Sequence, residues 1–410
     1  MGLHCNKRST KIVLWLTLAI FLVYLPINVL YLLVSGPSND SPSQNTLRSL
    51  SSIFSQVLPD KLPLTMKEII PQKDGNIDVV ININVAQLLQ SLDINTFGNP
   101  NGEATMNALP STFNITMHNK NFCKANPGLK WIIYVHTAPG NIGRRSILRS
   151  TWGNKNLFKD KRTAIVFLVG TPVDPKDQKI IDEEHKIYGD FVQGSFTEHY
   201  KNLTLKAILG LQWTSQHCPD VPYALKADDD AFINIFELAA ILERQPKKEK
   251  LIICPLWKDN SMPILRDPAK CMKWCVKYTE FPGKKYFPKY CAGLGFLMSK
   301  DMLPKMAAAA RTTPFFWIDD VYTTGLLAGK VPDVTYVDLL KNFTLKEAIA
   351  LEDYKKPLDH HVNFVFSHVK KKENFMAMWN ATLQRLSDDA IKLLSPESLQ
   401  LYPNLLAKAS

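Results

Sequence analysis

Hydrophobic positions follow two different periodicities in the central part of the chain. The runs "WIIYVHTAP" (131–139) and "AIVFLVG" (164–170) are short, continuous and rich in β-branched and aromatic residues, and they end in Pro or Gly. Such runs predict buried strands. The stretches 177–189 and 200–218 instead place apolar residues at helical spacing. Because strands alternate with helices, the pattern predicts an α/β fold with a mostly parallel sheet that carries helices on both faces.

The N-terminus shows an uncharged apolar stretch from 12 to 34, which is long enough to cross a bilayer. Lys7, Arg8 and Lys11 precede it, and the first charge after it is Asp40. By the positive-inside rule we expect a retained anchor with a cytoplasmic N-terminus and a lumenal remainder. A cleaved signal peptide is the alternative, although its apolar core would be shorter.

This topology divides the chain into four segments. Residues 1–11 form the expected cytoplasmic tail, 12–34 the transmembrane signal-anchor, and 35–121 a stem with an N-terminal region to which the pattern assigns no fold. The residues just after the anchor are rich in Ser, Pro and Asn, which is typical of flexible linkers. Residues 122–410 form the expected lumenal domain.

Composition limits the classes of partner. The chain has 410 residues, 46% of them hydrophobic, and a formal net charge of +11, so it can bury a sizeable core and attract acidic or phosphorylated ligands. It contains no basic block interleaved with aromatic residues, and nucleic acid is therefore not an expected partner.

The cysteines and glycosylation sequons agree with a lumenal location. Six of the seven cysteines follow the anchor, where an oxidising environment favours disulfides. Cys271 and Cys275 have a spacing that suits a metal, but no second Cys/His pair completes a zinc set, so structural thiols or disulfides are favoured. Sequons begin at Asn39, Asn114, Asn202, Asn342 and Asn380.

The most conspicuous polar feature is an acidic triplet, Asp228, Asp229 and Asp230, directly after the apolar run "YALKA". The run predicts a buried strand, and ligands of open α/β sheets bind at the carboxyl ends of strands. An extended triplet would turn Asp228 and Asp230 to one side and offer oxygen ligands to a divalent cation. The alternative is a solvated acidic turn or a helix N-cap.

Six segments, taken together and in order, resemble one family. The segments are "RRSILRSTWG" (144–153), "VFLVG" (166–170), "YKNLTLK" (200–206), "KADDDAFIN" (226–234), "KYCAGLGFLMSKD" (289–301) and "IDDVYTTG" (318–325). From 123 to 379 the chain resembles glycosyltransferase family 31, the β-1,3-galactosyltransferases and β-1,3-N-acetylglucosaminyltransferases of the Golgi.

The resemblance implies a GT-A-type fold, a UDP-sugar donor and Mn²⁺ at the acidic triplet. It makes Asp230 the direct metal ligand and places Asp228 near the nucleotide ribose or the water shell of the metal, with Asp229 on the donor side. His368, in "FSHVKK", resembles a C-terminal histidine that completes the metal site in many GT-A enzymes. A structural or surface role is the alternative for this histidine.

The same resemblance indicates donor contacts for Arg145, Arg149 and Lys206. Guanidinium groups suit phosphates, but two arginines four residues apart also share a helix face and can pair with acids instead. The family often has Asp two residues before the tyrosine of the "YKNLTLK" motif, where this chain has Glu198. Trp152, in "RRSILRSTWG", is expected in or at the edge of the core.

The acids Asp319 and Asp320 lie at a predicted helix start, where one can cap the helix and both favour its dipole. By resemblance the second is the catalytic base, so we assign that role to Asp320 and a capping or acceptor-contact role to Asp319. The family also suggests a disulfide between Cys123 and Cys218. Leu326 and Leu327 follow Gly325 where the family often has a cysteine, which leaves the partner of Cys291 open.

The implied activity is inverting transfer of a hexose or N-acetylhexosamine from a UDP-sugar to a hydroxyl of an acceptor glycan, in β-1,3 linkage. Galactose is the first donor sugar to consider. N-acetylglucosaminyl or N-acetylgalactosaminyl transfer, or a non-catalytic lumenal sugar-binding or chaperone relative, are the alternatives. The acceptor would be carried by a glycoprotein or glycolipid, and the enzyme would be a single-pass type II protein of the Golgi membrane.

Overall fold

The computed structural model describes residues 64–71, 77–83, 114–159, 162–402 and 405. The chain forms two compact units, Met1–Thr105 and Met106–Ser410. The predicted anchor, and the predicted stem up to residue 63, lie outside the described residues. Within the described residues, no helix is both long enough and apolar enough to span a bilayer.

The first unit contains one described element, an antiparallel strand pair. Strand β1 (Leu64–Pro71) pairs with β2 (Ile77–Ile83), and the register shifts between Met66 and Glu68. The sequence pattern assigned no fold to this region, and the pair supplies two strands of it.

The second unit is built on an eight-stranded mixed sheet. In spatial order its strands are β13 (Thr335–Asp338), β9 (Leu251–Cys254), β12 (Gly295–Ser299), β7 (Tyr223–Asp228), β4 (Leu129–His136), β5 (Arg162–Thr171), β6 (Phe191–Thr197) and β3 (Ile115–Met117). The central strands β7, β4, β5 and β6 are parallel, whereas β12 and β3 run antiparallel to their neighbours. Strand β3 shows that the sheet begins before residue 122.

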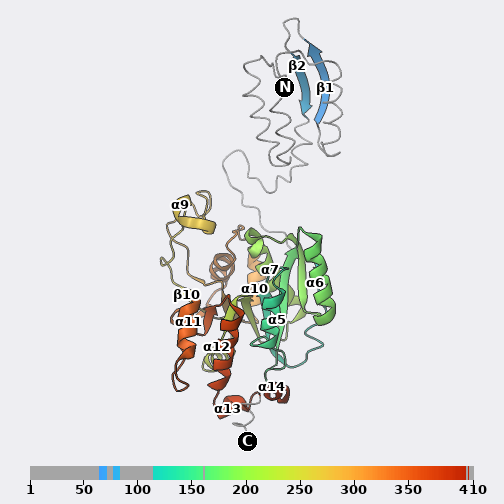
Figure 1. Ribbon diagram of the computed structural model, residues 1–410. Coiled ribbons are helices and arrows are strands. Elements are labelled where there is room, and N and C mark those ends of the chain that lie inside the picture. The colour runs from blue at the N-terminus through green and yellow to red at the C-terminus, as the bar shows by residue number, and fades with distance from the viewer. Residues whose placement is uncertain (1–63, 72–76, 84–113, 160–161, 403–404, 406–410) are drawn as a thin grey trace. The chain divides into compact units, whose positions relative to one another are not determined.

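Helices cover both faces of this sheet, as the sequence pattern predicts (Figure 1). Along β4, Ile133 and Val135 contribute to one buried cluster with residues of α5 (Ile142–Ser150), α6 (Pro175–Tyr188), α8 (Ile235–Glu243) and α12 (Lys372–Gln384). Ile132 and Tyr134 point to the opposite cluster, with α7 (Leu203–His217) and α10 (Met302–Ala310). A central strand buried on both faces explains why its sequence is continuously apolar.

Short elements complete the unit. Helical turns are η2 (Tyr200–Asn202), α9 (Pro268–Cys271), η3 (Met272–Trp274), the π-helix η4 (Val321–Leu327), η5 (Ala328–Lys330), η6 (Leu340–Asn342), α13 (Asp388–Ile391) and α14 (Pro396–Leu401). Strands β14 (Phe343–Thr344), β15 (Phe366–His368) and β8 (Ala231–Ile233) form a small sheet, and β10 (Leu256–Trp257) pairs with β11 (Tyr290–Cys291). Helix α11 spans Glu347–Lys355.

Helix α6 shows how local sequence sets element ends. The Asp174 side chain accepts a hydrogen bond from the Lys176 amide, Pro175 occupies the first turn, and Gly189 ends the helix in the left-handed region with φ of 64°. Each residue satisfies a terminal requirement that the helix backbone leaves open.

Three disulfides link the six cysteines that lie within the described residues. Cys123 pairs with Cys218, which confirms the pairing suggested by the family resemblance. The partner of Cys291 is Cys254, at the end of β9. Cys271, the last residue of α9, pairs with Cys275 across η3, in agreement with the structural role favoured over a metal site.

Candidate active site

The candidate site lies at the carboxyl ends of the parallel strands. Strand β4 ends at His136 and β7 at Asp228, and these two residues are neighbours in the register of the sheet. The antiparallel strand β12 begins at this edge, because Gly295 pairs with Ala227. Asp229 and Asp230 form a turn rather than continuing the strand, so the three carboxylates leave the sheet in different directions.

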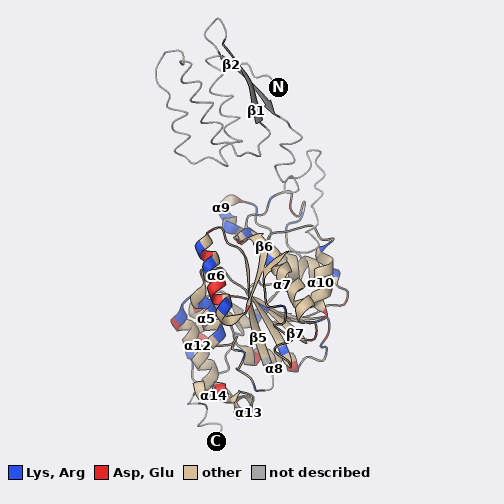
Figure 2. Ribbon diagram, turned by 90° about the vertical axis from the view of Figure 1, so that its right-hand side faces the viewer, with Lys and Arg blue, Asp and Glu red and all other residues tan. Residues whose placement is uncertain are grey.

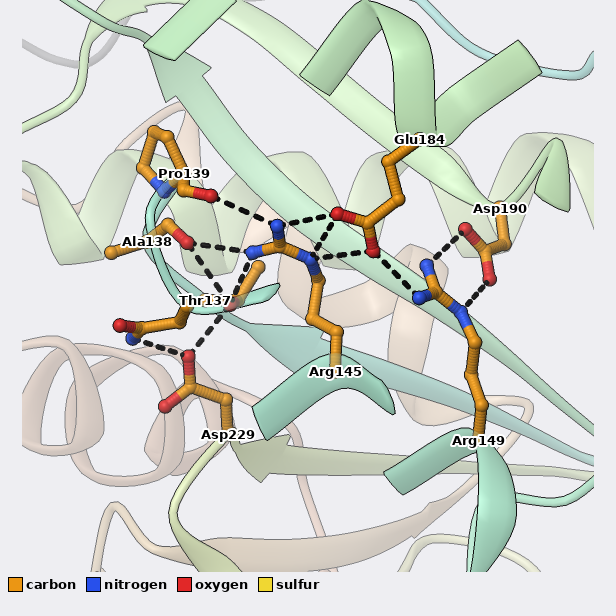
Figure 3. Close-up of polar contacts among 9 residues, drawn as sticks. Thr137, Ala138, Pro139, Arg145, Arg149, Glu184, Asp190 and Asp229 are labelled. Carbon is orange, nitrogen blue, oxygen red and sulfur yellow. Dashed lines mark hydrogen bonds and ion pairs between the residues drawn. The ribbon is translucent and has the colours of Figure 1, made fainter. Parts of the chain in front are cut away.

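Asp229 is the buried anchor of the triplet, with only 6% of its side chain exposed. Its Oδ2 accepts hydrogen bonds from Thr137 Oγ1 at 2.6 Å and Asn141 Nδ2 at 2.7 Å. Its Oδ1 accepts from Arg144 Nη1 at 2.8 Å. These bonds fasten the end of β7 to the loop that leads from β4 into α5, as part of the network in Figure 3 shows. Asp229 therefore holds this loop in place, and its expected donor-side role stays a prediction.

Asp230 faces a histidine that is distant in sequence. His368 Nε2 lies 3.2 Å from Asp230 Oδ2, because β15 pairs with β8 and sets His368 opposite Ala231. Arg144 Nη1 donates to the same oxygen at 3.3 Å. Burial opposes ionisation, but the hydrogen bond from His368 and the charges of His368 and Arg144 hold the pKa of Asp230 below its ordinary value.

The carboxylate of Asp230 and the imidazole of His368 are the kinds of ligand that the expected Mn²⁺ would take. Oxygen and imidazole nitrogen are ligands that divalent first-row metals accept, and Asp230 and His368 are already adjacent. Among the described residues, no group of three or more His, Cys, Asp or Glu side chains is arranged to hold a metal. A cation at Asp230 would therefore need further ligands from water or from a bound phosphate.

A buried lysine connects the triplet to the second acidic pair. Lys226 is 1% exposed, and its Nζ donates to Asp228 Oδ1 at 2.7 Å and to the Gly293 carbonyl. The same nitrogen lies 3.7 Å from Asp319 Oδ2. Burial lowers the pKa of Lys226, but the carboxylates of Asp228 and Asp319 more than compensate and raise it. Lys226 is thus a permanent positive charge between two carboxylates.

Asp320 caps a helix, and the pKa of its carboxyl group is raised. Its Oδ1 accepts a hydrogen bond from the Val321 amide at 2.8 Å and caps η4. Of the two roles expected for Asp319, the cap is therefore taken by Asp320, and the acceptor contact stays a prediction; the Asp319 side chain lies near the positive Lys226. Burial, reinforced by the charge of Asp319, raises the pKa of Asp320 to about 7.

Gly293 leaves room for the Asp320 carboxylate because it carries no side chain. A Cβ added at Gly293 would lie 3.2 Å from Asp320 Oδ2, which is tighter than ordinary van der Waals contact. Gly295 has a different task, since a Cβ there would meet the ring of Phe366 at 2.9 Å. In "CAGLG", Gly293 thus makes space for the Asp320 carboxylate, and Gly295 makes space for the ring of Phe366 in the core.

Arg145 and Arg149 form ion pairs with Glu184 and Asp190, and not with the acidic triplet (Figure 3). Arg145 is fully buried; its Nη2 lies 2.6 Å from Glu184 Oε2, and its guanidinium also donates to the carbonyls of Ala138 and Pro139. Arg149 Nη1 lies 2.6 Å from Glu184 Oε1, and Arg149 Nε lies 2.8 Å from Asp190 Oδ2. These contacts match the structural-pairing alternative.

Lys206 is also paired within the protein. Its Nζ donates to the Thr137 carbonyl and to Glu198 Oε1, both at 2.7 Å. The longer Glu side chain, which replaces the aspartate common in the family, reaches Gly170 as well, whose amide donates to Glu198 Oε2 at 2.6 Å. Trp152 is buried, and its Nε1 donates to the Ala231 carbonyl at 3.1 Å, which confirms its place in the core.

Three residues of the site were not identified from the sequence: Arg144, Lys226 and His136. Lys226 carries a recognisable signal, because a charged residue interrupts an apolar strand. Arg144 does not, since neighbouring arginines in a helix start give no indication which one faces the acids. His136 is buried; neither ring nitrogen has a hydrogen-bond partner among the described residues, and Nδ1 lies 3.6 Å from Asp319 Oδ2. Burial first, then Lys226 and Lys206, lower its pKa well below the usual value.

Comparisons with known proteins point to one family. A family model described as galactosyltransferase matches residues 143–339. Human β-1,3-galactosyltransferase 5 is 30% identical over 200 residues, which cover 49% of this chain and 63% of that protein. The mouse acetylgalactosaminyl-O-glycosyl-glycoprotein β-1,3-N-acetylglucosaminyltransferase is 33% identical over 206 residues, 49% and 51% of the two chains.

A third relative carries a different donor in its name. Human UDP-GalNAc:β-1,3-N-acetylgalactosaminyltransferase 1 is 30% identical over 217 residues, 51% of this chain and 62% of that protein. The chain therefore spans less than two thirds of the length of each of these relatives. Among solved structures, galactosyltransferase LgtC in complex with donor and acceptor sugar analogs covers 61% of this chain and 95% of that chain, at 10% identity and a TM-score of 0.32. That likeness is too distant to add to the description of the fold.

The region matched by the family model contains both acidic clusters and the buried lysines 206 and 226. His368 lies beyond it. The matches confirm the resemblance carried by the six sequence segments. Over residues 143–339 the chain is similar to the galactosyltransferase family, in agreement with its resemblance to family 31 of the glycosyltransferases.

Proposed function

We propose that the protein is an inverting β-1,3-glycosyltransferase that moves a hexose or N-acetylhexosamine from a UDP-sugar to a hydroxyl of an acceptor glycan. UDP-galactose is the first donor to test, because human β-1,3-galactosyltransferase 5 is among the relatives with significant identity. UDP-N-acetylglucosamine and UDP-N-acetylgalactosamine are the alternatives that the other two relatives suggest. We also propose a GT-A-type arrangement for the second unit.

One observation carries this proposal: Asp320, a half-buried carboxylate with a raised pKa, is next in sequence to Asp319, and Lys226 lies between Asp319 and Asp228 of the second acidic cluster. Burial and Asp319 raise the pKa of Asp320 to about 7. A general base works best when its pKa lies near the operating pH, because it is then both ionised and able to take a proton. Single-displacement transfer needs such a base on the acceptor side and positive charge on the donor side.

The residues of the chain divide these tasks. Asp320 accepts the proton of the acceptor hydroxyl as its oxygen attacks the anomeric carbon. Lys226 holds Asp319 and Asp228 in place, 3.7 Å and 2.7 Å from its Nζ. Arg144 lies beside Asp230 with 35% of its side chain exposed, and contributes positive charge there. We place donor-side charge on Arg144 because it is partly exposed beside Asp229 and Asp230, whereas the guanidinium groups of Arg145 and Arg149 lie against Glu184 and Asp190.

We propose that Mn²⁺ binds at Asp230 and His368, with Asp228 near its water shell. When bound, the cation would neutralise charge that develops on the departing diphosphate. His368 would then donate an imidazole nitrogen instead of sharing a proton with Asp230. The chemistry of these two side chains supports this assignment.

The decisive experiment is a donor panel combined with a glycan-acceptor array. The full chain is assayed with the three UDP-sugars, with and without Mn²⁺, and the product linkage is determined by methylation analysis. We expect transfer with one donor, a β-1,3 linkage and loss of activity after chelation. If all donors fail while UDP still binds, the non-catalytic alternative replaces the enzyme.

We further propose a Golgi location with a single N-terminal anchor. The apolar stretch 12–34 and the positive charges before it support this topology. N-terminal sequencing of the membrane-extracted protein tests it, because a mature chain that begins after about residue 35 would indicate a cleaved signal peptide. Protease protection in sealed vesicles provides the orientation.

A further inference from the structure

Three exposed or half-exposed aromatic rings, those of Tyr200, Trp274 and Trp317, are not used by the proposed mechanism. Tyr200 is 41% exposed and Trp274 is 45% exposed. The Trp274 Nε1 donates to the Tyr200 hydroxyl at 2.9 Å, so the two rings are joined at their polar edges. Trp317, the third ring, lies two residues before Asp319. Large aromatic side chains rarely remain exposed together without a partner.

The ammonium groups of two lysines lie over these rings. Lys273 Nζ lies 4.5 Å from the centre of the Tyr200 ring and 4.8 Å from that of Trp274. Lys201 Nζ lies 5.6 Å from the centre of the Trp317 ring. Within the described residues, the neighbouring carboxylates Glu198 and Asp267 pair with Lys206 and Lys270, and not with Lys201 or Lys273. Both positive charges are therefore available to a ligand that also contacts the rings.

The rings and lysines belong to three segments that long-range contacts bring together. The start of α7 is fixed to the third segment, because Thr204 Oγ1 donates to the Phe316 carbonyl at 2.7 Å. The Phe281 ring packs against that of Phe316 with centres 4.9 Å apart, which ties down the segment that carries Trp274. The disulfide between Cys271 and Cys275 closes the turn around Lys273 and Trp274.

This surface is next to the acids. Burial raises the pKa of Tyr200, the hydrogen bond from Trp274 opposes this, and the charges of Asp319, Asp320 and Asp228 raise the pKa further. Tyr200 thus lies within electrostatic range of the proposed base.

The surroundings are basic. Residues 258–289 contain eight Lys and Arg against three Asp and Glu, and Figure 2 shows blue positions on α9 in this segment. Such a charge balance attracts anionic ligands. A neutral glycan would gain nothing from it.

We infer that Tyr200, Trp274 and Trp317, with Lys201 and Lys273, form the acceptor subsite and select an acidic saccharide, one that carries a carboxylate or sulfate beside the accepting sugar. The apolar C–H face of a pyranose packs against the aromatic rings, which supply rigid contact area. The anionic group pairs with the lysine ammonium groups. This inference rests on the proposed function, since it assumes a glycan acceptor at Asp320.

Binding measurements test this without requiring turnover. The probes are two matched pairs, N-acetyllactosamine with its monosulfated form and methyl β-glucoside with methyl β-glucuronide. Calorimetric titrations use the full chain in detergent, saturated with UDP and Mn²⁺. We expect the charged member of each pair to bind about fivefold more tightly at low salt, as two exposed ion pairs allow. This preference should shrink as salt is added.

Variants assign the effect to named residues. The double variant Lys201→Gln, Lys273→Gln should bind both members of each pair equally, whereas Trp274→Ala should weaken both by about tenfold. Lys277→Gln and Tyr278→Ala are the matched controls, because these residues lie on the same exposed segment outside the ring cluster, and neither should change binding. UDP affinity, measured in every variant, shows that the donor side remains folded.

Three results would overturn the inference. These are equal binding of charged and neutral probes by the unmodified protein, a preference that persists in the double lysine variant, and no binding of any probe while UDP binds normally. If the unmodified protein fails to bind UDP, the proposed function fails as well, and the two failures are thereby distinguished.

Discussion

Replacing Asp320 by Asn separates a catalytic base from a helix cap. Asn keeps the shape and can still accept a hydrogen bond from the Val321 amide, which lies 2.8 Å from the carboxylate. It cannot take a proton. We therefore expect Asp320→Asn to lower kcat by about a hundredfold or more, with the Kd for UDP nearly unchanged.

The structure also gives the direction and size of an effect on stability. Burial and Asp319 raise the pKa of Asp320 from 3.8 to about 7, so holding it ionised above pH 7 costs on the order of 4 kcal/mol. The folded chain binds this proton more tightly than the unfolded chain, and its unfolding free energy falls as pH rises from about 4 to about 7. The unfolding free energy of the Asp320→Asn variant does not fall in this way, because Asn has no proton to lose. It should match the unmodified protein near pH 4 and exceed it in stability near pH 8.

Two assays check these expectations. Transfer from radiolabelled UDP-sugar is measured across pH, where kcat/KM of the unmodified protein should rise with pH and level off above about 7 as Asp320 and Asp228, whose pKa burial also raises to about 7, lose their protons. Urea unfolding near pH 4 and pH 8 is followed by tryptophan fluorescence. Asp319→Asn is the matched control. Normal turnover of Asp320→Asn would refute the base assignment, and loss of turnover in Asp319→Asn alone would reverse the two roles.

Three further predictions follow from the site geometry. Asp230→Ala should abolish Mn²⁺-dependent transfer while the thermal unfolding midpoint stays within a few degrees, because the change removes a ligand and no core volume; turnover at the normal rate would restore the view of the triplet as a solvated turn. Arg145→Ala should lower the unfolding free energy by about 3 kcal/mol, because it leaves Glu184 with only one buried partner. The exposed pair formed by Lys179 is the control, and Lys179→Ala should change stability by less than about 0.5 kcal/mol. Loss of UDP binding by Arg145→Ala with unchanged stability would instead support a phosphate contact. Gly293→Ala should lower kcat by about tenfold and leave the Kd for UDP unchanged, because the new Cβ would stand 3.2 Å from Asp320 Oδ2; an unaltered kcat would show that Asp320 does not need this space.

The local sequence was sufficient to predict the strands and helices that carry the site residues. The buried strands β4 and β5 and the helices α6 and α7 follow from apolar periodicity, because the repeats of strand and helix are properties of the local backbone. The triplet was placed correctly at the end of a strand for the same reason. The family followed from six motifs in order, none of which needs a structure to be recognised.

Long-range pairing decided the remainder. The sequence pattern predicted a mostly parallel sheet, but β12 runs antiparallel between β9 and β7, and this reversal brings the loop at Gly293 to the acids. Strand direction depends on the path of the chain between strands, which local periodicity does not record. The pairing of Cys291 with Cys254 depends on that path in the same way.

The sequence by itself determined which residue types are present for the chemistry: two acidic clusters, a histidine and several basic side chains. Only the tertiary structure decided their partners. Arg144 reaches the acids while Arg145 is buried against Glu184, and Asp320 caps η4 while Asp319 turns to Lys226. Adjacent residues on a helix or turn point in different directions, so the partner of each charge is set by whichever distant element packs opposite it.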